Sequence, residues 1–259
     1  MWSFCTSITA YLRELLVGQG CLICGNLLHD HDEILTSLCK SCQSAFHTDL
    51  SGTAHCKQCG RPLISELNTC MECRRSTEKG SIDRALALIP YIGWGKTLLG
   101  LYKFTGHRQL SWYFARELEY ARIWLVKQGW DFDAWVPVPP RKGKVHEVGW
   151  DQVALISRIL EKAQKHSQRL LVCEYLEEPP KPLPVCSCLA RLPSKIQKKL
   201  DRAGRYENMR NSIVCVRRPP KQVLLFDDVT TTGATLQACA AALRSAGAEK
   251  VITIALFYD

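Results

Sequence analysis

Four C-x-x-C motifs constrain this chain more strongly than any other feature of its sequence. They contain eight of its 14 cysteines and fall at Cys21/Cys24, Cys39/Cys42, Cys56/Cys59 and Cys70/Cys73. Two such motifs supply the four thiolates of one tetrahedral zinc site, because two intervening residues let the backbone fold tightly around the ion. The sequence therefore predicts two zinc ions. The alternative is disulfides or unrelated buried thiols, but in a 259-residue chain without a recognisable export signal we expect a reduced, cytoplasmic protein.

An internal repeat indicates which motifs share an ion. The frame C-x-x-C-G-x-x-L occurs at residues 21–28 and again at 56–63. Its glycine permits a turn that directs backbone amides at the sulfurs, so each site should begin with this frame and end with the plainer motif that follows. We therefore expect the first zinc on Cys21, Cys24, Cys39 and Cys42, and the second on Cys56, Cys59, Cys70 and Cys73. With four protein ligands each, both ions are structural, and binding free energies of about 10–16 kcal/mol stabilise a segment with little core.

Beyond residue 82 the sequence alternates between apolar strands and amphipathic helices. The expected strands are 85–92, 133–139, 222–228 and 251–258, and the expected helices are 94–104, 109–127, 151–165 and 234–247. Apolar runs as continuous as VLLF and VITIALF are typical of parallel strands buried on both faces. The predicted fold class is α/β, with a mostly parallel twisted sheet and an N-terminal double zinc-ribbon module.

This pattern divides the chain into three segments. We expect an amphipathic helix at 1–18, the zinc ribbons at 19–78 and the α/β domain at 82–259, with the polar stretch 74–81 as linker. Within the domain we also expect a strand at 170–176, irregular structure in the proline-rich 177–194 and a basic helix at 194–209. No apolar run approaches the length that a membrane span needs.

The positive charge is concentrated in the middle of the chain. The formal net charge is +9, and residues 96–222 hold 24 Lys and Arg against 12 Asp and Glu. An excess of this size suggests an anionic partner, either a phosphate or a nucleic acid. The alternative is a solvated basic face that keeps the protein soluble.

The stretch VLLFDDVTTTGATLQAC, residues 223–239, has the features of a phosphate-binding turn. An apolar strand ends in two acids, and a threonine-rich turn with one glycine leads into a helix whose first amides have no partner. The acids suit ribose hydroxyls or Mg²⁺, so a sugar phosphate fits both halves. An ATPase loop is excluded because G-x-x-x-x-G-K-[ST] is missing. The predicted site comprises Asp227, Asp228, Val229, Thr230, Thr231, Thr232, Gly233, Ala234 and Thr235.

This stretch resembles the phosphoribosyl-pyrophosphate (PRPP) motif of type I phosphoribosyltransferases. With the zinc ribbons, nearly the whole chain is similar to the ComF family (ComFC/GntX-like proteins). The family's P-V-P strand, followed by basic residues and R-G-F-N-Q, corresponds to Pro137-Val138-Pro139 and a loop that includes Gly149 and Gln152. Its other motifs correspond to Tyr102-Lys103-Phe104-Thr105-Gly106 and to Gln197, Leu200, Arg205 and Asn208. The chain departs from the family pattern at Val148, Trp150 and Asp151.

The resemblance implies a type I phosphoribosyltransferase fold and a site for phosphorylated ribose. It implies the 5′-phosphate at Thr231–Thr235, the ribose hydroxyls at Asp227 and Asp228, and the pyrophosphate, aided by Mg²⁺, at the basic loop after Pro139. The candidate catalytic residues are Asp227, Asp228, Arg141 and Lys142. Purine enzymes of this type have an aspartate base where this chain has Thr231, which argues against hypoxanthine or guanine as acceptor.

The resemblance also implies a role in competence, the uptake of transforming single-stranded DNA, with a DNA-uptake helicase or a recombination mediator as partner. Cations alternate with aromatic rings in 100–116, and 191–210 has seven Lys and Arg against two acids. The alternatives are that these aromatic rings face the core and that the basic run is a solvated helix face. The candidate nucleic-acid-binding residues are Lys103, Arg108, Lys198, Lys199, Arg202 and Arg205.

Two other functions stay open from the sequence. One is an active phosphoribosyltransferase of nucleotide metabolism with an unknown acceptor. The other is a zinc-ribbon adaptor that binds a partner protein and uses the α/β domain only as a platform.

Overall fold

The centre of the molecule is a four-stranded parallel sheet with the order β1-β6-β5-β2. The computed structural model describes residues 19–75, 80–141, 143, 149–165, 182–192 and 212–259. The strands are β1 (Arg84–Pro90), β2 (Ala134–Pro137), β5 (Gln222–Thr230) and β6 (Lys250–Tyr258). β5 and β6 are the inner strands, and their continuous apolar runs are buried, as the sequence predicts for a parallel sheet.

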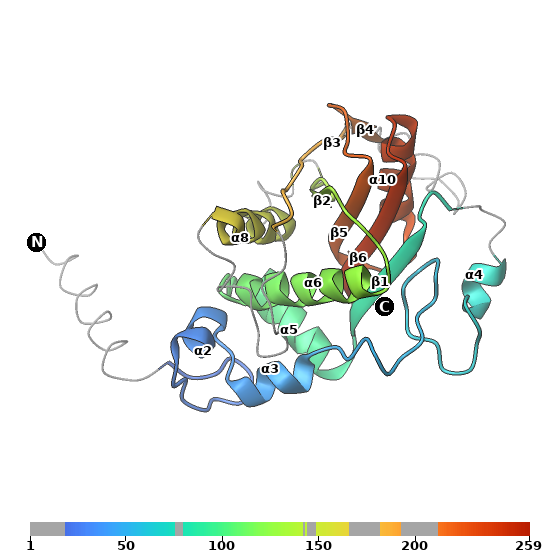
Figure 1. The fold of residues 1–259 in the computed structure, drawn as a ribbon. Coiled ribbons are helices and arrows are strands. Elements are labelled where there is room, and N and C mark those ends of the chain that lie inside the picture. Colours follow the sequence, from blue (N-terminus) through green and yellow to red (C-terminus); the bar gives the residue numbers. More distant parts are fainter. Residues whose placement is uncertain (1–18, 76–79, 142, 144–148, 166–181, 193–211) are drawn as a thin grey trace, which may run out of the picture.

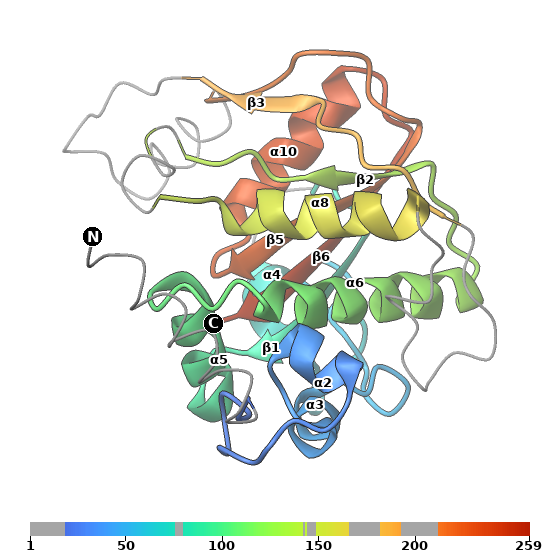
Figure 2. The same cartoon turned by 90° about the vertical axis from the view of Figure 1, so that its left-hand side faces the viewer.

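Helices cover both faces of this sheet (Figure 1). On one face lie α5 (Gly93–Lys103), α6 (Leu110–Lys127) and α8 (Gln152–Lys165), whose apolar side chains share a core with Leu224, Phe226 and Ile254. On the other face lies α10 (Ala234–Ser245), which shares a second core with Val223, Leu225 and Val251. Figure 2 shows α6 and α8 side by side in front of the sheet, where they pack against each other.

A short antiparallel pair of strands lies beside α10. β3 (Leu189–Arg191) pairs with β4 (Ile213–Cys215), and both strands contact the helix. β3 falls in the segment 177–194 that the sequence predicts to be largely irregular, and no sequence pattern indicates β4. The predicted helix at 1–18, the predicted strand at 170–176 and the predicted helix at 194–209 lie outside the described residues, as does part of the predicted linker.

The second cysteine cluster covers the edge of the sheet at β1. The amides of Ala85 and Ala87 donate to the carbonyls of Lys57 and Gly60, each at 3.1 Å. A methyl group on Gly60 would lie 2.4 Å from the carbonyl carbon of Leu86, so only a glycine allows this approach. An edge strand with free amides is a site for unwanted pairing, and the zinc-ribbon segment removes that hazard here.

The first cysteine cluster docks on α6 and α5. Its segment contributes α2 (His31–Thr36) and α3 (Lys40–Phe46), which lie beneath α6 in Figure 2. Arg116 on α6 is buried and donates to Asp32 and to Gln43, and His47 lies 3.0 Å from Glu117. The α4 helix (Met71–Arg75) belongs to the second cluster. Both cysteine segments are therefore joined to the α/β part by specific polar contacts.

Of the helices in the described ranges, not one is both long and apolar enough to cross a membrane.

Candidate metal centres and phosphate-binding turn

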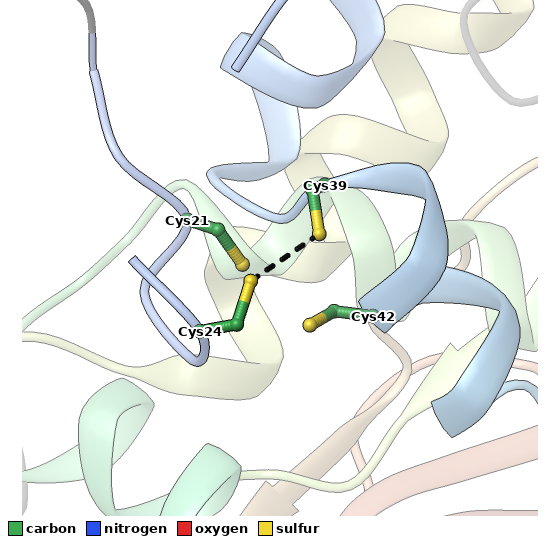
Figure 3. Close-up of side chains that lie close together, drawn as sticks. All are labelled: Cys21, Cys24, Cys39 and Cys42. Atoms are coloured by element: carbon green, nitrogen blue, oxygen red, sulfur yellow. Dashed lines mark hydrogen bonds between the residues drawn. The ribbon is translucent and has the colours of Figure 1, made fainter. Parts of the chain in front are cut away.

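The first four cysteines converge on one point. Figure 3 shows the sulfurs of Cys21 and Cys24, from a loop, facing those of Cys39 and Cys42, from the start of α3. All four Sγ atoms lie within 4.8 Å of one another, and those of Cys24 and Cys39 are 3.6 Å apart. A tetrahedral ion with Zn–S bonds of about 2.3 Å places its ligands about 3.8 Å apart, whereas a disulfide needs about 2 Å. The spacing fits a metal site and excludes a disulfide.

The second four cysteines form the same arrangement. The sulfurs of Cys56, Cys59, Cys70 and Cys73 also lie within 4.8 Å of one another. The Sγ atoms of Cys59 and Cys70 are 3.8 Å apart, and the amide of Cys70 donates to the sulfur of Cys56 at 3.4 Å. The motifs are thus paired as the internal repeat predicts. The two groups of four cysteines fit two structural zinc ions in a double zinc ribbon.

The glycine of the repeat has the conformation that the sequence predicts for it. Gly25 and Gly60 have φ values of 76° and 79°, in the left-handed region that other residues rarely adopt. Each closes a turn in which its amide donates to the carbonyl of the first cysteine, Cys21 or Cys56, at 2.9 Å. The turn brings the two sulfurs of the motif to one side of the backbone.

Local hydrogen bonds favour a thiolate at one cysteine of each cluster. The pKa of Cys56 is lowered to about 4 by the Cys59 thiol, against the effect of burial, with help from the amides of Cys70 and Cys59. For Cys21, burial raises the pKa, but the amides of Cys24 and Cys39 outweigh it and lower the value to about 7. Thiolates are the metal-binding form of cysteine, so each cluster has one sulfur predisposed to bind.

Arg61 offsets part of the charge of the second cluster. Its guanidinium hydrogen-bonds to the Cys59 side chain, which raises the pKa of Arg61, and it also pairs with Glu72. Four thiolates and one Zn²⁺ carry a formal charge of −2. A permanently charged arginine at the edge of the site offsets part of it.

The turn between β5 and α10 is open to solvent. Thr231 and Thr232 are exposed, and Gly233 has a φ of 74°, which lets the chain reverse sharply into the helix. The amide of Ala234, the first residue of the helix, donates to the hydroxyl oxygen of Thr232 at 3.4 Å, and Gly233 has no side chain with which to cap the helix. The first turn of a 12-residue helix therefore presents backbone amides beside two hydroxyl groups. Such a surface suits a phosphate group.

The two acids before this turn lie on opposite faces of the sheet. The sequence predicts that the strand ends at Asp228, but β5 continues to Thr230, so Asp227 and Asp228 follow the alternation of a strand. Asp227 accepts a hydrogen bond from the amide of Asp228 at 2.8 Å and faces α10. Burial raises the pKa of Cys239 on that helix, and the charge of Asp227 raises it further. Asp228 faces α5. The prediction that the strand ends with these two acids is therefore wrong, because the strand continues to Thr230.

Lys103 reaches the candidate site from α5. Its ammonium lies 2.8 Å from a carboxylate oxygen of Asp228, and only 22% of the lysine side chain and 9% of the aspartate side chain are exposed. The sequence predicts Lys103 as a nucleic-acid contact within the segment 100–116, and the structure pairs it with Asp228, a residue of the predicted sugar-phosphate site. Sequence reasoning misses this pair because its members lie far apart in the chain, and no local pattern indicates it.

The loop after β2 begins at the same edge of the sheet as this turn. β2 and β5 are parallel, with Pro137 aligned to Phe226, and the amide of Val138 donates to the carbonyl of Phe226 at 3.0 Å. The carboxyl ends of neighbouring parallel strands share one edge of a sheet, which is where open α/β sheets bind ligands. Arg141 is exposed in this loop, and Lys142 lies outside the described residues.

The predicted stacking surface in 100–116 is mostly core. Tyr102 and Tyr113 are buried, so these two rings face the core and are not a stacking surface. Phe104, in contrast, is 81% exposed. The Arg108 guanidinium lies 5.4 Å from the centre of the Trp150 ring in a cation–π contact. The other candidate nucleic-acid-binding residues are outside the described part of the chain: Lys198, Lys199, Arg202 and Arg205.

Comparisons with known proteins do not assign a family to this chain. No protein-family model matches the chain, and no curated protein is similar to it.

Proposed function

We propose that this chain is a ComF-like protein with a type I phosphoribosyltransferase fold, which binds phosphorylated ribose and takes part in handling transforming single-stranded DNA. The observation that carries the proposal is the exposed turn at Thr231–Gly233, where the first helix amides and two hydroxyl groups meet at the carboxyl edge of a parallel sheet. The double zinc ribbon, similar to that of the family, stands at the expected place in the chain.

The proposed binding mode assigns a part of the ligand to each feature of the site. The 5′-phosphate binds at the amides of Gly233–Thr235 and at the hydroxyl of Thr232. The ribose hydroxyls donate to Asp228, whose largely buried carboxylate lies on the α5 face of β5. Arg141, in the loop after β2, supplies a cation for a second phosphate group. Catalysis, if PRPP reacts, consists of positioning and of stabilising charge on the leaving pyrophosphate.

Calorimetry with ribose 5-phosphate tests the binding site. We expect binding to the full-length, zinc-loaded protein, and Thr232→Val should weaken it about tenfold or more, because a hydrogen bond to a charged group is lost. Thr53→Val, at an exposed threonine of the zinc-ribbon segment, is the matched control and should leave the affinity unchanged. Absence of binding by the unaltered protein would remove the proposed function.

The release of pyrophosphate separates an enzyme from a binding protein. Incubation with PRPP and Mg²⁺, with and without single-stranded DNA, should yield pyrophosphate only if an acceptor is present. Turnover that requires DNA would support both parts of the proposal, the binding of phosphorylated ribose and the handling of single-stranded DNA. Pyrophosphate release without DNA, where water is the available acceptor, would show turnover that is independent of DNA.

The exposed tip of the second ribbon favours an additional adaptor role. Ile64 and Leu67 are 99% and 85% exposed in the loop between the two motifs of that cluster. Large exposed apolar side chains that lie close together are typical of protein-binding surfaces. If a DNA-uptake helicase binds here, Ile64→Ser/Leu67→Ser should abolish its co-purification and leave ribose 5-phosphate binding intact. Loss of both would instead indicate misfolding of the ribbon.

A further inference from the structure

We infer that Lys103 is a built-in counter-cation of Asp228, which lets the site bind a phosphorylated pentose without a divalent metal ion. The inference rests on the proposed function and departs from the magnesium-assisted binding that the sequence suggests. It makes Lys103 part of the ligand site, where it takes the place that a metal ion would occupy beside Asp228.

The pair is held by two rigid elements. Asp228 lies within β5 beside β6, two residues beyond Phe226, where the pairing with β2 ends, and Lys103 is the last residue of α5. The carbonyl end of a helix has a partial negative charge, which stabilises an ammonium group there. The distance of 2.8 Å from Nζ to Oδ2 and the low exposure of both side chains describe a close ion pair with little solvent around it.

The buried tyrosine next to the pair adds no charge to it. Tyr102 precedes Lys103 on α5 and is fully buried, and its hydroxyl donates to the carbonyl of Gln152 at 3.0 Å. Burial raises the pKa of Tyr102, and the charges of Asp228 and Asp151 raise it further. The phenol therefore stays neutral and adds no negative charge for the lysine to balance.

An ammonium at this position disfavours a metal ion at the same carboxylate. Mg²⁺ binds carboxylate oxygens in close, near-octahedral geometry, and the oxygen that faces α5 already contacts Lys103. Binding of Mg²⁺ there has to displace the ammonium or tolerate a like charge beside it in a poorly solvated place. A sugar hydroxyl, in contrast, can donate to the carboxylate while the ion pair stays intact.

The same ion pair removes the repulsion between Asp228 and an anionic ligand. An uncompensated Asp228 would repel a phosphate at the neighbouring turn, since only Val229 and Thr230 separate the acid from Thr231. With Lys103 in place, the carboxylate is neutralised, and the helix amides face the phosphate without that repulsion. The preferred ligand class is therefore a pentose phosphate in its metal-free form.

Calorimetry in two buffers tests the inference on the full-length, zinc-loaded protein. Ribose 5-phosphate is titrated in buffer freed of divalent cations and in the same buffer with millimolar Mg²⁺. For the unaltered protein, the two affinities should agree within about twofold. Lys103→Met should lose about tenfold or more in the metal-free buffer and recover when Mg²⁺ is added, whereas Lys103→Arg should behave like the unaltered protein. Lys96→Met, at an exposed lysine of the same helix, is the control.

The outcomes separate this inference from the proposed function. If the unaltered protein binds only with Mg²⁺, or if Lys103→Met binds normally in the metal-free buffer, the inference is wrong and the proposed function stands. If the unaltered protein binds in neither buffer, both are wrong. Should Lys103→Met fail to fold, Lys103→Met/Asp228→Asn removes both charges together. That variant has no carboxylate left to balance, so Mg²⁺ should no longer improve its affinity for ribose 5-phosphate, and an affinity that still rises with Mg²⁺ would overturn the inference.

Discussion

At the scale of single residues, two glycines with the same backbone conformation have different surroundings. Gly25 and Gly60 occupy the same position in the repeat, and both have φ in the left-handed region. A Cβ atom on Gly25 would meet no atom within 4 Å, whereas one on Gly60 would meet the backbone of β1 at Leu86 and Ala87. The repeat predicts the turn at both positions. It does not predict the contact with the sheet, because that contact is tertiary.

This difference gives a matched pair of variants. Gly25→Ala should cost about 1–2 kcal/mol, the penalty for an L-residue in the left-handed region. Gly60→Ala should cost clearly more, because the added methyl group also has to displace the β1 backbone, 2.4 Å away at its nearest atom. Urea unfolding of both zinc-loaded variants measures the two costs. Equal losses would show that the second ribbon does not press against β1.

The twin aspartates show the limit of interpreting single residues from the sequence. Sequence patterns identify a strand such as β5 reliably, but its end only to within a few residues. Because side chains alternate along a strand, an extension of two residues decides where each acid points. The sequence therefore predicts the acids as members of the site, but their separation onto opposite faces, with Asp228 toward Lys103, requires the structure.

At the scale of elements, length and regularity decide what the sequence predicts. The four strands of the sheet and the helices α5, α6, α8 and α10 are all predictable within a few residues, because each has a sustained apolar pattern. β3 and β4 have three residues each, and only their mutual pairing defines them. The stripe of aromatics in α5 and α6 shows the same ambiguity, since a core face and a stacking surface have similar spacing.

The basic run 191–210 is the element on which single-stranded DNA binding depends. Each phosphate neutralised on a single strand contributes about 0.7 to the slope of log affinity against log salt. Lys198→Ala/Lys199→Ala/Arg202→Ala should therefore reduce the slope by about 2 in fluorescence anisotropy with a labelled oligonucleotide. A triple alanine variant at exposed lysines elsewhere, Lys57, Lys127 and Lys250, should leave it nearly unchanged. An unaltered slope in the first variant would exclude this run as the binding surface.

At the scale of the whole molecule, the two metal sites hold the zinc ribbons against different parts of the α/β core. The second ribbon covers the β1 edge through two backbone hydrogen bonds, and the first docks on α6 through Arg116 and His47. Metal binding at such sites is coupled to folding. Chain segments with few apolar side chains thereby become fixed parts of the molecule.

Acid should release both zinc ions. Protons compete with zinc for the thiolates, so the zinc content should fall as the pH falls. A chromophoric zinc indicator should count two ions per chain at neutral pH and fewer on acidification. Cys24→Ser removes a ligand of the first site alone, so the variant should retain only the second ion at neutral pH. Loss of both ions from this variant would contradict the separate sites.

The account as a whole depends on the turn between β5 and α10, and a crystal structure of the zinc-loaded protein with ribose 5-phosphate tests it most directly. We predict the phosphate at the amides of Gly233–Thr235 and beside Thr232, and the ribose hydroxyls toward Asp228 with the Lys103 ion pair intact. A ligand bound elsewhere, or a turn left empty at saturating ribose 5-phosphate, would contradict the central claim.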